Sequence, residues 1–362
     1  MHDHYAIARW LSRKAKPRHR ERLVIADLRF ATFGAGFWAG YQLAAWREVP
    51  GATCVAIYNR TRERAAVLAS RFGIPAVYDD AEALLAEVRP DFVDIITDSS
   101  THLHFVELAA RHGVAAVCQK PLAPTLAEAE AMARACAESG VPLIVHENWR
   151  WQRPIRELNS ILRTGAIGRP FRATITFCSS FPVFDNQPFL RDLDQFLLAD
   201  VGVHILDAAR FLFGEASRVY CQTERVHRDI RGEDVATVVM RIGELTCACE
   251  LSYASRLERE RFPETFVLVE GDAGSAELAP DYWIRVTTAD GTNARRCPPP
   301  VYRWADPAYS LIHSSIVACN EDILRALRTG QRAETDASDN LKTLRLVFAA
   351  YESAASGRAL EV

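Results

Sequence analysis

The stretch from Leu28 to Ala39 reads Leu-Arg-Phe-Ala-Thr-Phe-Gly-Ala-Gly-Phe-Trp-Ala and decides the fold of this chain. A short apolar run, Leu28–Phe33, leads directly into the pattern Gly-x-Gly-x-x-Ala, and a helical pattern follows. In such a unit the first glycine permits a tight turn, and the second lets backbone amides approach a pyrophosphate at the start of a helix. The context of strand before and helix after therefore predicts a dinucleotide site. Its first expected contacts are Gly34, Gly36, Phe37 and Trp38.

The same unit of apolar run and amphipathic helix repeats as far as His146. The apolar runs are Leu28–Phe33, Thr53–Tyr58, Phe92–Ile96, Ala115–Cys118 and Pro142–Val145. Each is short and nearly continuous, which is typical of strands buried on both faces of a parallel sheet. With right-handed crossovers, this alternation predicts a doubly wound α/β sheet, a Rossmann domain over residues 23–147.

After His146 the periodicity of the sequence changes. Phe171, Ala173, Ile175 and Phe177 alternate with polar residues, which predicts a strand with one exposed face. Further strand-like runs and two closing helical segments follow, so we expect a second α/β domain over residues 148–362 with a large, mostly antiparallel open sheet. One sheet face would pack on helices and the other on a second subunit, giving a substrate-binding domain that also forms a homodimer or a dimer of dimers.

Composition sets the broad class of the protein. The 362 residues carry a formal net charge of -3, with 49% hydrophobic and 25% charged residues, which is typical of a soluble globular protein without a nucleic-acid partner. Residues 1–22 form an N-terminal extension whose basic run, Arg9–Arg22, is either a solvated terminus or an arm for an acidic partner. Neither a membrane span nor a signal peptide is evident, so we expect a cytoplasmic protein.

The nine cysteines lie scattered along the chain without a Cys-x-x-Cys pair. Cys247 and Cys249 share one face of an expected strand, and such residues are more often small core side chains than zinc ligands. We therefore expect reduced thiols and no metal.

The end of the second expected strand holds Tyr58-Asn59-Arg60-Thr61-Arg62, where an acidic residue would favour NAD. Asn59 can hydrogen-bond an unphosphorylated ribose. Arg60 and Arg62 either contact the phosphate of NADP or simply open a solvated helix. Both NAD and NADP remain open.

Three further motifs lie after the strands. They are Thr97-Asp98 with His102, then Cys118-Gln119-Lys120-Pro121, then Asp200-Val201-Gly202-Val203-His204. Together they resemble the glucose-fructose oxidoreductase and inositol dehydrogenase family, called Gfo/Idh/MocA, over nearly the whole chain from Leu28 onward. The resemblance implies a lysine that faces substrate and nicotinamide and an Asp-x-x-x-His pair that completes the catalytic groups.

By this resemblance the catalytic residues are Lys120, Asp200 and His204, and the cofactor also meets Thr97, His102, Gln119 and Lys120. Two positions depart from the family pattern, since Gln119 stands where Glu is usual and Asp98 where Pro is usual. Neither change removes a catalytic group.

Elementary chemistry supports these roles. Oxidation of a hydroxyl-bearing carbon requires a proton acceptor, and a histidine such as His204 titrates near neutral pH. Lys120 supplies a cation for the developing alkoxide without a metal. Asp200, one helical turn before His204, can orient the substrate hydroxyl or the imidazole. The structural alternative is that Asp200 caps a helix and His204 is a core histidine.

The substrate is expected to be a sugar. Asn148 and Arg150 either line its cleft or belong to an aromatic core segment. Residues 145–213 resemble family members that oxidise the branched aldose D-apiose to its lactone. The expected reaction is therefore oxidation of an aldose at its anomeric carbon. Oxidation of a ring secondary alcohol, as in inositol dehydrogenases, and a non-catalytic dinucleotide-binding regulator remain the alternatives.

Overall fold

The computed structural model of the chain describes residues 27–362. The N-terminal extension and its basic run, Arg9–Arg22, lie outside the described residues. No helix in the described part is both long and apolar enough to cross a membrane.

The first sheet has six parallel strands in the order β3-β2-β1-β4-β5-β6. Its strands are β1 (Leu28–Phe33), β2 (Ala52–Tyr58), β3 (Ala76–Tyr78), β4 (Phe92–Ile95), β5 (Ala115–Gln119) and β6 (Leu143–His146). The predicted doubly wound sheet is confirmed. Because the strand order reverses between β1 and β4, the carboxyl ends of the strands leave a crevice there, the usual ligand site of such sheets.

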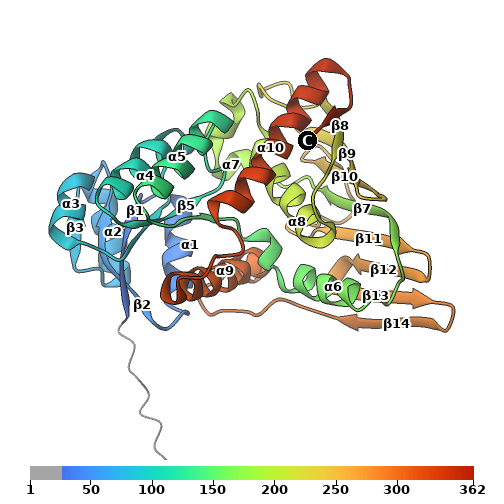
Figure 1. Ribbon diagram of the computed structural model, residues 1–362, viewed down its shortest axis with the longest axis horizontal. Helices are drawn as coiled ribbons and strands as arrows, with labels where there is room; N and C mark the ends of the chain where they lie inside the picture. Colours follow the sequence, from blue (N-terminus) through green and yellow to red (C-terminus); the bar gives the residue numbers. More distant parts are fainter. Residues whose placement is uncertain (1–26) are drawn as a thin grey trace, which may run out of the picture.

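Helices cover both faces of this sheet (Figure 1). They are α1 (Phe37–Trp46), α2 (Arg62–Phe72), α3 (Ala81–Val88), α4 (His102–Arg111) and α5 (Leu126–Glu138). A late helix, α9 (Ser310–Thr329), also packs on the first sheet. Its Ile316 and Ile323 share one buried cluster with Phe30 and Trp46, so a C-terminal element completes a layer of the first domain.

The second sheet has nine strands in the order β14-β13-β12-β11-β7-β10-β9-β8-β15, and only β7 and β10 pair in parallel. Its strands are β7 (Pro170–Cys178), β8 (Arg218–Glu224), β9 (Val235–Ile242), β10 (Leu245–Ser252), β11 (Phe266–Gly271), β12 (Gly274–Ala279), β13 (Trp283–Thr288), β14 (Gly291–Arg296) and β15 (Leu360–Glu361). The predicted mostly antiparallel sheet is confirmed.

Burial along the second sheet alternates as predicted, with Ala173, Ile175 and Phe177 of β7 buried. Helices α6 (Arg153–Arg163), α8 (Val203–Phe213) and α10 (Ala337–Ser356) lie on the inner side of the second domain (Figure 1). Short helical turns complete the chain: η1 (Ser99–Thr101), η2 (Trp149–Trp151), α7 (Val183–Asn186), η3 (Pro188–Asp192), η4 (Leu198–Gly202), η5 (Pro280–Tyr282) and η6 (Pro307–Tyr309).

Cys247 and Cys249 lie on the inner face of β10, fully buried and free, as core side chains. Within residues 27–362, no group of three or more His, Cys, Asp or Glu side chains is arranged to hold a metal ion.

Candidate active site

The two glycines of the loop between β1 and α1 have different reasons to be glycine. Gly34 has a φ of +110°, and a Cβ built there would lie 2.7 Å from the carbonyl oxygen of Ile96. The fold itself therefore demands glycine at this position. Gly36 has an ordinary φ of -80°, and a Cβ built there would meet no atom within 4 Å. No contact within the fold demands glycine here, and the open space beside the backbone at this helix start forms a cradle that fits the pyrophosphate of a dinucleotide.

The aromatic residues after the glycines lie at the first turn of α1. Phe37 is 59% exposed, and Trp38 is half-buried with its indole N–H unpaired among the described residues. Phe37 therefore borders the cradle at the surface, whereas Trp38 also packs against the buried hydrophobic clusters.

Asn59 ties the end of β2 to the glycine loop. Its Oδ1 accepts a hydrogen bond from the backbone N–H of Ala35 at 3.1 Å, and its Nδ2 donates to the carbonyl of Thr61 at 2.8 Å. The structure thus brings Asn59 to the cradle, and a ribose contact by Asn59 stays a prediction. Arg60 is exposed, whereas Arg62 lies 3.7 Å from Asp79 at the surface of α2.

His102 braces the loops that follow β4 and β5. It is buried, with Nδ1 3.0 Å from the carbonyl oxygen of Leu122 and Nε2 3.1 Å from that of Thr97. Burial lowers the pKa of its imidazole below the ordinary value. The expected cofactor residue Thr97 is therefore held in place by His102. Asp98, where the family usually has Pro, caps η1 by accepting a hydrogen bond from the N–H of Ser100.

Gln119 belongs to a buried chain of hydrogen bonds in the first domain. Its Nε2 donates to Oε1 of Gln42 at 2.5 Å, and Gln42 in turn donates to Oδ1 of Asp94 at 2.6 Å. Burial raises the pKa of Asp94 to about 7, although hydrogen bonds from Trp46 and Gln42 oppose this. The Oε1 of Gln119 accepts the backbone N–H of Lys120 at 3.1 Å. Gln119 therefore supports the lysine from behind, a role the sequence did not indicate.

Lys120 reaches from the first domain to the second. Its Nζ donates to Oδ1 of Asp200 at 2.9 Å and to the backbone carbonyl of Asp200 at 2.8 Å. Both side chains are about four-fifths buried, with exposures of 19% and 18%. Asp200 lies in η4, a π-helical turn that runs into α8, and such turns are frequent at functional sites. Asp200 pairs with Lys120 and not with the imidazole of His204, and its contact with a substrate hydroxyl stays a prediction.

His204 pairs with a carboxylate that the sequence reasoning missed. Its Nδ1 lies 2.6 Å from Oε1 of Glu147, directly after β6, and the imidazole stacks on Trp149 with ring centroids 4.5 Å apart. His204 is 4% exposed and Glu147 is fully buried. Burial alone would raise the pKa of Glu147, but the charge and hydrogen bond of His204 hold it below its ordinary value. The charge of Lys120 acts in the same direction, so the two pairs form one electrostatic unit.

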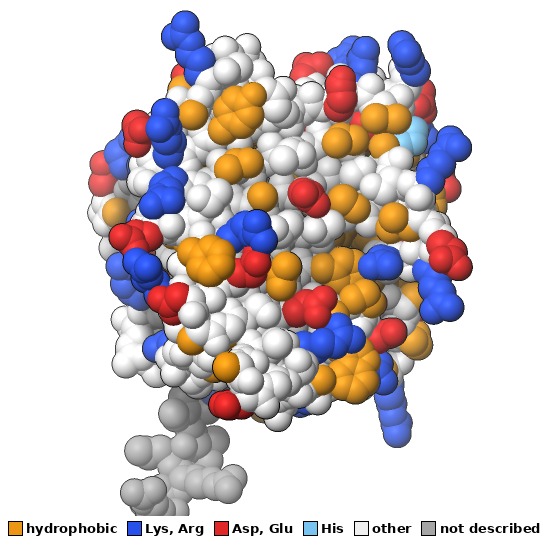
Figure 2. All heavy atoms as spheres, turned by 90° about the vertical axis from the view of Figure 1, so that its right-hand side faces the viewer, with side chains coloured by type: hydrophobic (Ala, Val, Ile, Leu, Met, Phe, Trp, Pro, Cys, Tyr) orange, Lys and Arg blue, Asp and Glu red, His pale blue; other side chains and the backbone are white. Residues whose placement is uncertain are grey.

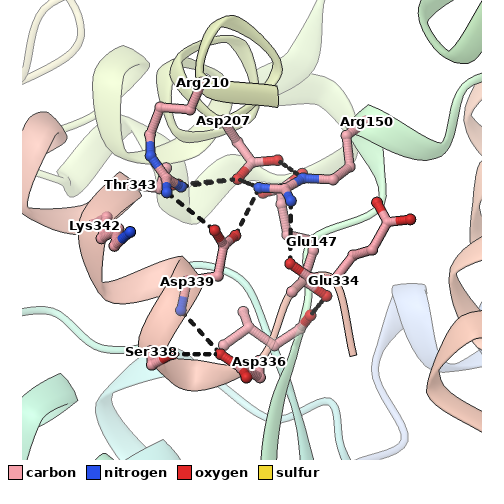
Figure 3. Close-up of polar contacts among 12 residues, drawn as sticks. Glu147, Arg150, Asp207, Arg210, Glu334, Asp336, Ser338, Asp339, Lys342 and Thr343 are labelled. Carbon is pink, nitrogen blue, oxygen red and sulfur yellow. Dashed lines mark hydrogen bonds and ion pairs between the residues drawn. The ribbon is translucent and has the colours of Figure 1, made fainter. Parts of the chain in front are cut away.

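Asn148 and Arg150 contact helices of the second half of the chain. Asn148 donates through Nδ2 to Oγ of Ser315 on α9 at 2.8 Å. Arg150 forms a bidentate pair with Asp207 of α8, at 2.7 and 2.5 Å, and reaches Asp339 of α10 at 2.8 Å (Figure 3). The guanidinium is thus engaged in a buried network, and a substrate contact by Arg150 stays a prediction.

The arrangement offers two charged pairs suited to acid–base chemistry. One pair, Lys120–Asp200, holds a cation at the domain junction, and the other, His204–Glu147, holds an imidazole against a buried carboxylate. A cation stabilises a developing oxyanion, and an imidazole exchanges a proton near neutral pH.

Comparisons with known proteins identify the family of the chain. Residues 28–147 match the oxidoreductase family with an NAD-binding Rossmann fold, and residues 155–277 match the GFO/IDH/MocA C-terminal domain. The chain is 45% identical to a D-apiose dehydrogenase of Paraburkholderia graminis, across 92% of this chain and 89% of that relative. It is 41% identical to a D-apiose dehydrogenase of Rhizobium rhizogenes, across 93% and 98%.

Among solved structures, the chain resembles an oxidoreductase from Agrobacterium radiobacter in complex with NAD+, L-tartaric acid and magnesium. The TM-score is 0.91 at 41% identity, with 93% of this chain and 98% of that chain covered. The resemblance drawn from the sequence motifs and the prediction of a nicotinamide-dependent dehydrogenase are both confirmed. The chain belongs to the GFO/IDH/MocA family of NAD-binding oxidoreductases.

Proposed function

We propose that this enzyme oxidises an aldose, D-apiose or a similar sugar, at its anomeric carbon to the lactone, with NAD or NADP as the hydride acceptor. The observation that carries the proposal is the meeting of the Lys120–Asp200 and His204–Glu147 pairs at the domain junction. The names of two relatives, each a D-apiose dehydrogenase and above 40% identity, support the choice of sugar.

The chain's own residues supply proton transfer and charge stabilisation. A bound nicotinamide would supply the hydride acceptor, held by the glycine cradle and Asn59. His204, whose Nδ1 faces Glu147, takes the hydroxyl proton on Nε2. Lys120, fixed by Asp200, stabilises the negative charge that develops on the substrate oxygen as the carbonyl forms. The anomeric hydroxyl thus gives its proton to His204, the hydride of the anomeric carbon would go to the bound nicotinamide, and the aldose becomes the lactone.

The test is a panel of aldoses and polyols, D-apiose included, assayed with NAD and with NADP by the absorbance of the reduced nicotinamide. Mass spectrometry identifies the lactone. Replacement of Lys120 or of His204 by alanine should lower turnover by about 100- to 10,000-fold each and leave dinucleotide affinity intact. The two losses should not add, since the groups act in one step. Activity confined to ring secondary alcohols, or near wild-type turnover of His204→Ala, would overturn the proposal.

Cofactor choice follows from the end of β2. Asn59 offers no carboxylate to repel a phosphate, and Arg60 is exposed beside it. We therefore propose that NAD and NADP are both accepted with modest preference. The cytoplasmic location stays a prediction.

For the assembly, we propose that the open face of the second sheet pairs with a second copy. Val239, Ala248, Thr174 and Leu268 are cross-strand neighbours in one row of that face, and Leu268 is 41% exposed. Viewed from the side of the second domain, this face carries hydrophobic side chains among charged ones (Figure 2). Sedimentation at micromolar concentrations should give a dimer or tetramer. Ala248→Arg should dissociate it, and a monomeric wild type would contradict the proposal.

A further inference from the structure

Glu147 is the buried carboxylate behind His204. Its Oε1 accepts two hydrogen bonds, from Nδ1 of His204 at 2.6 Å and from the backbone N–H of Trp149 at 3.0 Å. Its Oε2 is buried and has no partner within residues 27–362. A carboxylate oxygen left unpaired in the interior is costly, and hydrophobic residues of similar size would avoid that cost. The arrangement therefore calls for a reason other than stability.

The position of Glu147 relative to α8 is fixed by a second pair, Arg150–Asp207. Glu147 and Arg150 lie on the segment that leaves β6, and His204 and Asp207 lie on α8. Both pairs, Glu147–His204 and Arg150–Asp207, join residues 57 apart in sequence. Figure 3 shows Arg150 between Asp207 and Asp339, with Glu147 beside it. This bidentate clamp prevents the carboxylate from sliding relative to the imidazole.

The geometry determines which nitrogen of His204 can act. Because an ionised carboxylate only accepts hydrogen bonds, the imidazole must carry its proton on Nδ1. Nε2 is then the nitrogen with a free electron pair. Trp149, stacked at an interplanar angle of 21°, fixes the plane of the ring.

We infer that Glu147 is a positioning residue for the catalytic base: it sets the tautomer of His204 and stabilises the imidazolium that forms when the sugar hydroxyl loses its proton. A carboxylate behind a catalytic histidine plays this part in the triads of hydrolytic enzymes. The inference rests on the proposed function, in which His204 is the base.

Several charged or titratable groups lie near the Glu147–His204 pair. Lys120 and Arg150 are cations, each paired with a carboxylate. His146 is adjacent, and burial lowers its pKa to about 4, so its ring is neutral near pH 7. The thiol of Cys319, which donates to the backbone carbonyl of Glu147, has its pKa raised well above the ordinary value by burial. Burial raises the pKa of Asp94 to about 7, but Asp94 is the same in wild type and variant. A difference in the acid limb between the two therefore reports on Glu147 and His204.

The first test replaces the charge and keeps the hydrogen bonds. In Glu147→Gln the amide oxygen can still accept from His204 and Trp149, but the imidazolium loses its counter-charge. We expect kcat to fall by about 100-fold or more and the acid limb of kcat/KM to move to lower pH by about 1–3 pH units. Glu147→Asp, which retains the charge, should keep the acid limb near that of wild type at reduced kcat.

The matched control is Glu334→Gln. The backbone carbonyl of Glu334 accepts a hydrogen bond from Arg150, but its carboxylate pairs with Arg156. This variant should leave both the rate and the pH profile unchanged. If Glu147→Gln lowers the rate without moving the acid limb, Glu147 is only a structural residue and the inference is wrong.

A second measurement needs neither a folded variant at position 147 nor an active enzyme. Nitrogen-15 NMR of histidine-labelled wild type, with His204 assigned by its loss in His204→Gln, should show the Nδ1–H tautomer near neutral pH. An Nε2–H tautomer would overturn the inference. If instead the tautomer is as expected and His204→Ala retains wild-type turnover, the proposed function fails and the positioning contact stands.

Discussion

Alanine replacements at Gly34 and Gly36 should separate the folding role of the glycine loop from its binding role. The two residues stand two positions apart in the same loop and receive the same added methyl group. Gly34 has a φ of +110° and its added Cβ would lie 2.7 Å from a backbone oxygen, whereas the Cβ added at Gly36 meets nothing within 4 Å.

The magnitudes follow from these contacts. At Gly34, the left-handed conformation costs about 1–2 kcal/mol for alanine. Displacement of the backbone at Ile96 adds about 1–3 kcal/mol. Gly34→Ala should therefore lose about 2–5 kcal/mol of unfolding free energy. Gly36 precedes α1 with extended backbone, so Gly36→Ala should lose about 1 kcal/mol or less.

Dinucleotide affinity, in contrast to stability, should be the property that Gly36→Ala impairs. In Gly36→Ala, the methyl group occupies the space through which a pyrophosphate approaches the backbone. Crowding of about 1–3 kcal/mol would weaken dinucleotide binding by about 5- to 150-fold. The assays are thermal unfolding by circular dichroism and fluorescence titration with the reduced dinucleotide. A Gly36→Ala variant that binds like wild type would show that the cradle holds no pyrophosphate, and equal melting temperatures of the two variants would refute the structural distinction.

Three further predictions address other parts of the molecule. Asn59→Asp retains the acceptor for the N–H of Ala35 but adds a charge, so the ratio of kcat/KM values should shift toward NAD; an unchanged ratio would place Asn59 away from the ribose. Arg150→Met leaves Asp207 buried without its bidentate partner and should cost about 3–5 kcal/mol in urea unfolding, while a loss under about 1 kcal/mol would mean that the network relaxes. Burial alone would raise the pKa of Glu260, but hydrogen bonds from Ser180, Phe262 and Ser179 lower it to about 2 from its ordinary 4.5. Its contribution to stability is therefore present above pH 4.5 and lost as the pH falls through 2, so Glu260→Gln should flatten the acid loss of stability in that window, and an unchanged slope would contradict the assignment.

The fold was largely predictable because its signals are local. The run from Leu28 to Ala39 contains strand, turn and helix together, and the period-two pattern of β7 shows directly in burial. The packing of α9 on the first sheet was not predictable in this way. Its amphipathic pattern indicates that one face is buried but does not indicate which surface that face packs against.

The site was predictable only in part. Lys120, Asp200 and His204 lie in motifs, whereas Glu147 carries no motif and acquires its partner through a contact across 57 residues. The sequence contains one indication of the buried hydrogen bonds of Gln119, Gln42 and Asp94. Asp94 is a charged residue inside an otherwise apolar strand, which favours an interior hydrogen-bond network. The role of Gln119 in that chain depends on the position of Gln42 on α1, which only the folded arrangement provides.

Each of the two acid–base pairs draws one member from each half of the chain: Lys120 meets Asp200, and Glu147 meets His204. Swinging the halves apart would separate Lys120 from Asp200, whereas Glu147, tied to α8 through Arg150 and Asp207, would stay with His204. An opened molecule would therefore keep its imidazole pair and lose the cation beside it. Chimeras face the same constraint. A hybrid that inherits residues 28–147 from one family member must inherit a compatible segment 200–207 with them, because each pair at the junction takes one residue from each half.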